Sequence, residues 1–233
     1  MYYWKQLAWD IGLHWGDHNP NPRNLDWYGK EAVRLENDEL HLTVLHKPQT
    51  FSDGSTKPYC VGYLSSIDTV HRGHLKVEYT LPVGRHLWPA IWLFSPVSWP
   101  PEIDIMEGWT NTRGNYRKLF KNKIFPTVHF VAADGRHRWQ TFHDGIFNGT
   151  RAARQPLDGR CTCELLWHGD SMEFRYNGHR VGLLTDRDIL KRLDQPMNVI
   201  LNLAVGYDFT AADYTDYRHF GREFIIHDLT YEQ

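Results

Sequence analysis

Residues 87–109 read LWPAIWLFSPVSWPPEIDIMEGW, and this stretch decides the fold. Its first half is almost wholly apolar, which is typical of a strand inside a packed sheet. Side chains of a strand point alternately to its two faces. The alternation places four side chains, two of them indoles, on one face: Trp88, Ala90, Trp92 and Phe94. Two indoles on one face of a strand are commonly part of a core, and the alternative is an aromatic surface that the strand offers to a ligand.

The second half of the stretch holds three acids within six residues. Glu102 and Asp104 share a strand face by parity, whereas Ile103 points to the opposite face, which we expect to be the core. Five steps from Glu102 would turn Glu107 inward, where an unpaired carboxylate is costly. One extra residue near Met106, accommodated as a β-bulge, returns Glu107 to the face of the other two acids. We predict that all three acids face one cleft.

The rest of the chain indicates many strands and almost no helix. Three segments alternate with period two and are predicted as half-buried strands: 40–44, 75–81 and 199–205. Among the turn signals between strands, Asn177-Gly178 is suited to a type I′ hairpin. One short helix is predicted, with Thr185 as its cap and Gln195-Pro196 at its end. Since no linker or repeat divides the chain, we predict one all-β domain over residues 1–233, a sandwich of two sheets.

Composition excludes several classes of protein. The chain has 233 residues, 41% hydrophobic and 23% charged, so a disordered chain is excluded. Lys and Arg total 26 against 28 for Asp and Glu, which gives no overall field to attract nucleic acid or an anionic membrane. The sequence shows neither a signal-peptide pattern nor an apolar run long enough to span a membrane. The three cysteines are too few for a disulfide scaffold and are expected to be structural thiols.

The acids and the indoles together point to sugar chemistry. A retaining glycosidase uses two carboxyl groups about 5 to 5.5 Å apart, and one attacks the anomeric carbon while the other protonates the leaving oxygen. A third carboxyl between them, as at Asp104, would keep the pair in opposite protonation states. Indole rings stack on the apolar faces of sugars. A metal site is the alternative interpretation of three clustered carboxylates.

The whole stretch resembles the signature of glycoside hydrolase family 16, whose members carry a Glu-x-Asp-x-x-Glu motif on a bulged strand of a β-jelly roll. Upstream of it, GHLKVEYTLPVG at 73–84 occupies a place where the family has a comparable strand, and downstream of it MNVILNLAVG at 197–206 matches one of the family's later strands. The resemblance implies a concave substrate cleft with Glu102 as nucleophile, Asp104 as assisting acid and Glu107 as general acid/base. It also implies substrate-binding roles, which we assign to five residues: Trp88, Trp92, Trp109, His129 and Asn202.

The resemblance further implies that no cofactor is needed for catalysis, and that Asp228 could help to bind a structural calcium ion. A separate feature is the segment 111–123, which carries five cations, Arg117 among them, and no acid. Because guanidinium groups suit sulfate and carboxylate, this segment would favour an anionic polysaccharide. An ordinary solvated loop is the other interpretation.

We expect a monomeric, retaining, endo-acting β-glycoside hydrolase whose partner is a polysaccharide, with no nucleic acid or membrane partner. The first candidate substrate is a β-1,3- or mixed-linkage glucan, and the second is an algal-type galactan such as agar, porphyran or carrageenan. A transglycosylase and a lectin-like glycan-binding module on the same scaffold are the remaining alternatives. Family members are usually secreted, and the compartment of this chain stays open.

Overall fold

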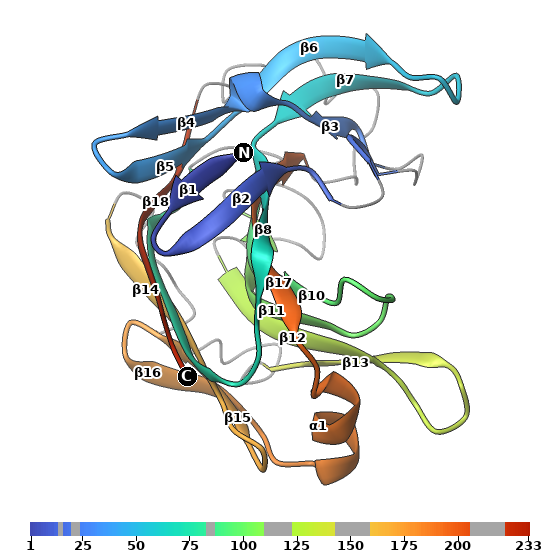
Figure 1. Cartoon of the computed structure of the whole chain (residues 1–233), viewed down its shortest axis with the longest axis vertical. Helices are drawn as coiled ribbons and strands as arrows, with labels where there is room; N and C mark the ends of the chain where they lie inside the picture. The colour runs from blue at the N-terminus through green and yellow to red at the C-terminus, as the bar shows by residue number, and fades with distance from the viewer. Residues whose placement is uncertain (14–15, 20–23, 83–86, 110–122, 143–158, 206–221) are drawn as a thin grey trace.

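A computed structural model describes residues 1–13, 16–19, 24–82, 87–109, 123–142, 159–205 and 222–233. Within these ranges the chain is almost entirely β-structure, arranged in three sheets (Figure 1). No helix in the described part of the chain is both long and apolar enough to cross a membrane.

The first sheet has eight antiparallel strands and carries the stretch that opened the sequence analysis. In spatial order its strands are β1 (Tyr2–Trp4), β2 (Leu7–Ile11), β8 (Tyr63–Val70), β17 (Met197–Val205), β10 (Leu87–Phe94), β11 (Glu102–Trp109), β12 (Lys123–Val131) and β13 (His137–Thr141). β11 therefore lies between β10 and β12, and strands from distant parts of the sequence flank it.

The second sheet has seven antiparallel strands and packs against the first. In spatial order its strands are β16 (His179–Leu184), β15 (Met172–Tyr176), β14 (Cys161–Trp167), β9 (Gly73–Thr80), β18 (Phe224–Glu232), β5 (Glu39–Leu42) and β4 (Val33–Glu36). The two large sheets form the predicted β-jelly-roll sandwich. Their inner faces share one core, in which Ile91, Ile103 and Tyr176 are buried.

A third, three-stranded sheet covers one end of the sandwich (Figure 1). Its strands are β3 (Asp26–Tyr28), β7 (Thr56–Val61) and β6 (Val44–Thr50), and β3 runs parallel to β7. This sheet was not predicted from the sequence. It pairs β3 with β7, a strand some 30 residues later, and no local sequence pattern indicates that pairing. A 3-10 turn at Lys30–Ala32 follows β3.

Two local predictions need correction. The segment 40–44 is not one strand, since β5 ends at Leu42 and β6 begins at Val44 in another sheet. The helix α1 spans Arg187–Leu193, and its N-cap is Asp186 rather than Thr185. The Asp186 carboxylate accepts hydrogen bonds from two backbone N–H groups of the first turn, which a carboxylate does well at the positive end of a helix.

Other local predictions are confirmed. Asn177 and Gly178 both have positive φ, as the type I′ turn between β15 and β16 requires. All three cysteines are free and buried. On β10 the odd-numbered side chains point into the core, where Ile91 and Leu93 are fully buried, so the even-numbered ones face outward as predicted.

Candidate active site

The predicted β-bulge is present in β11 and brings the three acids to one surface. Pairing with β12 runs in register to Asp104 and resumes at Glu107, with a shift between them. Ile105 and Met106, which lie in the shifted segment, are both fully buried. The bulge thus places two consecutive side chains in the core, which accommodates the extra residue. Glu107 therefore returns to the side of Glu102 and Asp104, and all three line the same cavity.

Cross-strand pairing places the neighbours of each acid. Glu102 stands between Phe94 on β10 and His129 on β12. Asp104 stands between Trp92 and Thr127 in the same way. Directly opposed residues share a face of the sheet, so the aromatic side chains of β10 lie beside the acids. The geometry joins the indole face and the acidic face that the sequence predicted separately.

The cavity over this surface has a volume of about 470 Å³ and extends from β11 across β10 and β17 to β3. Its polar wall is formed by the three acids together with Asn202 and Asp26. Its apolar wall is formed by aromatic rings: Tyr28, Tyr63, Trp88, Trp92, Phe94 and Trp99. A cavity with rings on one side and convergent hydrogen-bonding groups on the other suits the two kinds of surface on a sugar ring.

Burial raises the pKa of all three carboxyl groups. For Glu102, loss of solvation raises the pKa well above its ordinary value, and repulsion from Asp104 adds to the effect. For Asp104, burial and then repulsion from Glu107 raise the pKa well above its usual range. The pKa of Glu107 is also raised by burial, although His129 and the Trp88 indole oppose the shift. The raised pKa values favour the protonated form of a carboxyl group, which acid catalysis requires.

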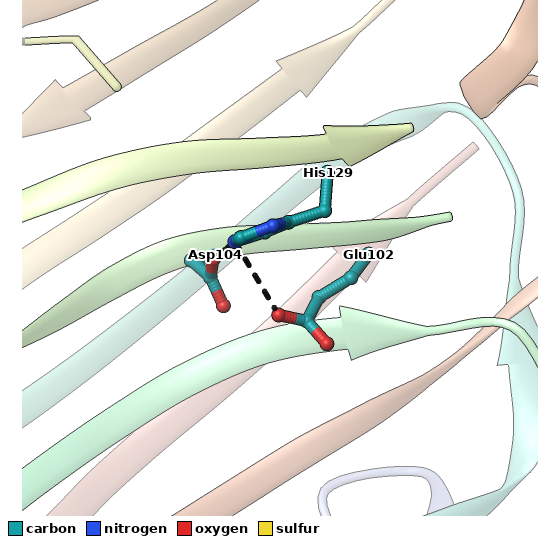
Figure 2. A group of neighbouring side chains, drawn as sticks. All are labelled: Glu102, Asp104 and His129. Atoms are coloured by element: carbon teal, nitrogen blue, oxygen red, sulfur yellow. Dashed lines mark ion pairs between the residues drawn. The ribbon is translucent and has the colours of Figure 1, made fainter. Parts of the chain in front are cut away.

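His129 lies beside two of the acids, and all three side chains point toward one another (Figure 2). Its Nε2 atom is 3.4 Å from Asp104 Oδ2 and 3.7 Å from Glu102 Oε1. Among the described residues these three form the only group whose ligand atoms are close enough together to hold a metal ion. Asp104 Oδ2 is buried and accepts no hydrogen bond from any residue that the structure describes. The site can therefore accept either a proton or a cation at this oxygen.

The other predicted cleft residues are well placed where the structure describes them. The Trp92 indole donates a 2.7 Å hydrogen bond to Asn202 Oδ1, which fixes both side chains at the cavity wall. Asn198 shares a strand with Asn202 but instead donates to the backbone of Ser66, outside this cavity. Of these two asparagines, only Asn202 lines the cavity.

Three predictions gain less from the structure. Arg117 and the basic segment lie outside the described residues, and so does the side chain of Trp109. Asp228 is about half exposed and pairs with Lys5, whose Nζ is 3.2 Å from Asp228 Oδ1. The calcium site therefore stays a prediction. The charged partner that the structure gives Asp228 is the side chain of Lys5.

Sequence reasoning missed two residues at the site. His137 on β13 lies 2.9 Å from His129, measured between His137 Nε2 and His129 Nδ1. Asp26 on β3 lines the cavity although it is 76 residues away from Glu102 in sequence. No sequence pattern marks either residue. Trp99, in the loop before β11, is one of the indoles that the sequence groups around the acids, and the structure adds that its Nε1 donates a 2.9 Å hydrogen bond to Glu102 Oε2.

With this geometry in hand, comparisons with known proteins are informative. No family model matches the chain. A glucan endo-1,3-beta-glucosidase from Cryptopygus antarcticus is 31% identical over 59% of the chain and 52% of that protein. A beta-glucanase from Rhodothermus marinus is 28% identical over 85% of the chain and 68% of that protein. A galactan endo-beta-1,3-galactanase from Flammulina velutipes is 28% identical over 48% of each protein. The chain thus spans about half the length of two of these relatives.

Solved structures share the fold. A structure from work on endo-acting O-glycanases of human gut microbes superposes with a TM-score of 0.74 at 19% identity, over 97% of this chain and 84% of that chain. The LamAcat structure from Zobellia galactanivorans superposes with a TM-score of 0.72 at 18% identity, over 97% and 90%. At these identities the similarity establishes the jelly-roll fold. The curated relatives are glycoside hydrolases by name, so in sequence the chain is similar to enzymes of that class.

Proposed function

We propose that this chain is a retaining, endo-acting β-glycoside hydrolase of the family 16 type, with residues 1–233 as its catalytic domain and no catalytic cofactor. The observation that supports this proposal most directly is the bulge in β11, which turns Glu102, Asp104 and Glu107 to one cavity wall. Folding alone gives no reason to place three carboxyl groups along one cavity wall, since burial of such a cluster costs stability. Catalysis gives a reason for that cost.

In the proposed first step, the Glu102 carboxylate attacks the anomeric carbon while the bond from that carbon to the glycosidic oxygen breaks. Glu107 gives its proton to the departing oxygen, which leaves as a hydroxyl group. In the second step Glu107, now ionised, takes a proton from water, and the water oxygen displaces Glu102 from the sugar. Asp104 lies between Glu102 and Glu107 on the strand. By holding a proton or a hydrogen bond, it keeps one of the two glutamates ionised while the other is protonated.

The first candidate substrate is a β-1,3- or mixed-linkage glucan. Two of the curated relatives bear glucanase names, and their matches cover 59% and 85% of the chain, respectively. The cavity continues across several strands of the open sheet instead of closing around one sugar. An open cleft admits the middle of a polymer, which supports internal cleavage.

A galactan is the second candidate, because one relative is named a β-1,3-galactanase. Its match covers less of the chain than either glucanase match. The basic segment around Arg117 would favour a sulfated galactan, and neutralising it should then impair cleavage of a sulfated substrate more than that of a neutral one.

The proposal is tested by measuring reducing-sugar release from laminarin, lichenan, agarose, porphyran and carrageenan. We expect laminarin or lichenan to be cut internally, with a rapid fall in viscosity. Proton NMR of the first product should show the β-anomer before mutarotation, since two displacements restore the starting configuration. An α-anomer would refute the retaining mechanism. Binding without cleavage of any of these polymers would instead identify a lectin-like module, and transfer to added sugar in place of water a transglycosylase.

A further inference from the structure

The concave face of the large sheet continues beyond the acids onto the hairpin of β12 and β13. Glu102 pairs with His129, and His129 pairs in turn with Trp139 on β13. Opposed residues of an antiparallel sheet share a face, so these three form one row that runs across the strands. The row starts at a proposed catalytic residue and ends at the edge of the sheet. The cavity described above extends from β11 in the other direction, over β10 and β17, and Trp99 borders both regions.

A line of aromatic rings covers this second half of the face. The ring centroids of Trp99 and His137 are 4.7 Å apart, and those of His137 and Trp139 are 5.8 Å apart. His137 also stacks on His129, with centroids 5.2 Å apart and planes only 13° from parallel. The hydrogen bond between these two imidazoles fixes the His137 ring. The rings therefore form a surface whose members hold one another in place.

These rings are too exposed to serve the core. Trp139 is 64% exposed and Trp99 is 51% exposed. A contiguous exposed aromatic surface costs solubility and usually marks an interaction site. Strand β12, which carries His129, is also bonded to the helix, because Arg192 of α1 donates a 2.9 Å hydrogen bond to the Val131 carbonyl. Burial lowers the pKa of His137, and nearby His129 lowers it further, which favours the neutral imidazole. A neutral ring suits an uncharged sugar.

We propose that His137 and Trp139 form a stacking platform for the sugars on the leaving-group side of the bond that is cut. This inference rests on the proposed function and deepens it. An endo-acting enzyme needs contacts on both sides of the reacting bond, and the cavity supplies one side only. The sugar whose anomeric carbon is attacked needs the more closely fixed position. The walled cavity, with Asn202 and Asp26, offers such positions, whereas the open platform suits a fragment that must depart before water enters.

Trp139→Ala tests the platform with two substrates of different reach. Laminarihexaose occupies both sides of the cleavage point. β-Laminaribiosyl fluoride has a single fluorine atom as its leaving group and does not reach the platform. We expect Trp139→Ala to lower kcat/KM for the hexasaccharide about tenfold or more, as truncation of an anchoring indole does at other interfaces, and to change that for the fluoride less than about twofold. With the fluoride as donor, added laminaribiose should yield fewer transfer products in the variant than in the wild type.

Arg138→Ala is the matched control, because Arg138 precedes Trp139 on the same strand, points to the opposite face and pairs with Asp134. It should behave like the wild type with both substrates. An equal fall of both rates in Trp139→Ala would indicate a general structural role and overturn the platform, and so would unchanged cleavage of the hexasaccharide. A wild-type protein that cleaves neither compound would refute the proposed function on glucans itself, and the platform for glucans with it.

Discussion

The indole N–H of Trp99 donates a 2.9 Å hydrogen bond to Oε2 of Glu102. A donor aimed at a carboxylate stabilises its ionised form, so this bond lowers the pKa of Glu102. Burial and the neighbouring Asp104 act in the opposite direction and prevail. A nucleophile must be ionised to attack. Trp99 therefore helps to extend toward lower pH the range in which the proposed mechanism can operate.

Trp99→Phe should move that lower end upward. Removal of the donor takes away one of the two influences that oppose burial, the other being His129, so the pKa of Glu102 rises and the acidic limb of kcat/KM against pH shifts to higher pH. Well above the limb, we expect a loss of about tenfold or less. Trp139→Phe is the control, because it also removes an exposed indole but contacts no acid of the site. If the acidic limb stays in place in Trp99→Phe, the hydrogen bond does not tune the nucleophile.

The two glutamates should be distinguishable by chemical rescue. Glu102→Gly and Glu107→Gly should each lower turnover on laminarin by at least about 10³, because each removes a group that acts in the transition state. Azide added to Glu102→Gly, with β-laminaribiosyl fluoride, should attack directly in place of the nucleophile and give the α-glycosyl azide. In Glu107→Gly azide should instead displace Glu102 from the sugar and give the β-azide. NMR of the products would reveal an exchanged assignment.

The position of the acids could be predicted from sequence because one physical rule left few choices. Parity would have buried Glu107 without a partner, and a bulge was the simplest way to avoid that cost. The predicted helix cap was wrong by one residue. Thr185 and Asp186 are both good capping residues, and only the local backbone decides between them. His137 reaches the site through the pairing of β12 with β13 and a contact between two rings. Such contacts depend on register, which single residues do not encode.

Asp104→Asn should stabilise the fold while it impairs catalysis. The pKa of Asp104 is raised by burial and by Glu107, so its ionised form disfavours the folded state. Stability from the neutral acid is present at low pH and is lost as pH rises through the raised pKa. The amide does not ionise, so we expect a gain on the order of 0.5 to 2 kcal/mol at pH 8 and little change at pH 4. Urea unfolding at both pH values measures it, and a gain independent of pH would contradict this explanation.

Asp26 should act through the backbone of β17. Its buried Oδ2 accepts a 2.9 Å hydrogen bond from the N–H of Val205, and the buried Lys57 lies near enough to lower its pKa in part. Asp26→Ala leaves a buried donor unpaired and should cost about 1 to 3 kcal/mol. Asp26→Asn keeps an acceptor and should cost less. Thermal unfolding compares them, with Asp170→Asn on the surface as the control.

The pH dependence separates charge from hydrogen bonding at Asp26. Burial raises its pKa from 3.8 to about 6. As pH rises from about 4 through 6, the wild type ionises this buried group and loses the corresponding stability, whereas Asp26→Asn does not. The difference in unfolding free energy between the two should therefore shift in favour of the variant across that range. A constant difference would show that Asp26 is ionised throughout.

Zinc ions should inhibit the protein at the Glu102, Asp104 and His129 cluster. In a tetrahedral zinc site with bonds of about 2.0 to 2.1 Å, neighbouring donor atoms lie roughly 3.3 to 3.4 Å apart. His129 Nε2 is 3.4 Å from Asp104 Oδ2 and 3.7 Å from Glu102 Oε1, so small side-chain movements would complete the set. Bound zinc would occupy the proposed nucleophile. Cleavage of laminarin should fall reversibly with added zinc, and EDTA should restore it.

The same cluster predicts how that inhibition depends on pH and on one side chain. Protons compete with the metal for all three ligands, so inhibition should weaken as the solution is made more acidic. His129→Asn removes the nitrogen ligand and should raise the zinc concentration for half-inhibition about tenfold or more, whereas His74→Asn, on the other sheet, should leave it unchanged. EDTA alone should leave the activity of the wild type intact, because the proposed mechanism runs on carboxyl groups. Equal zinc sensitivity of wild type and His129→Asn would place the inhibitory ion elsewhere on the molecule.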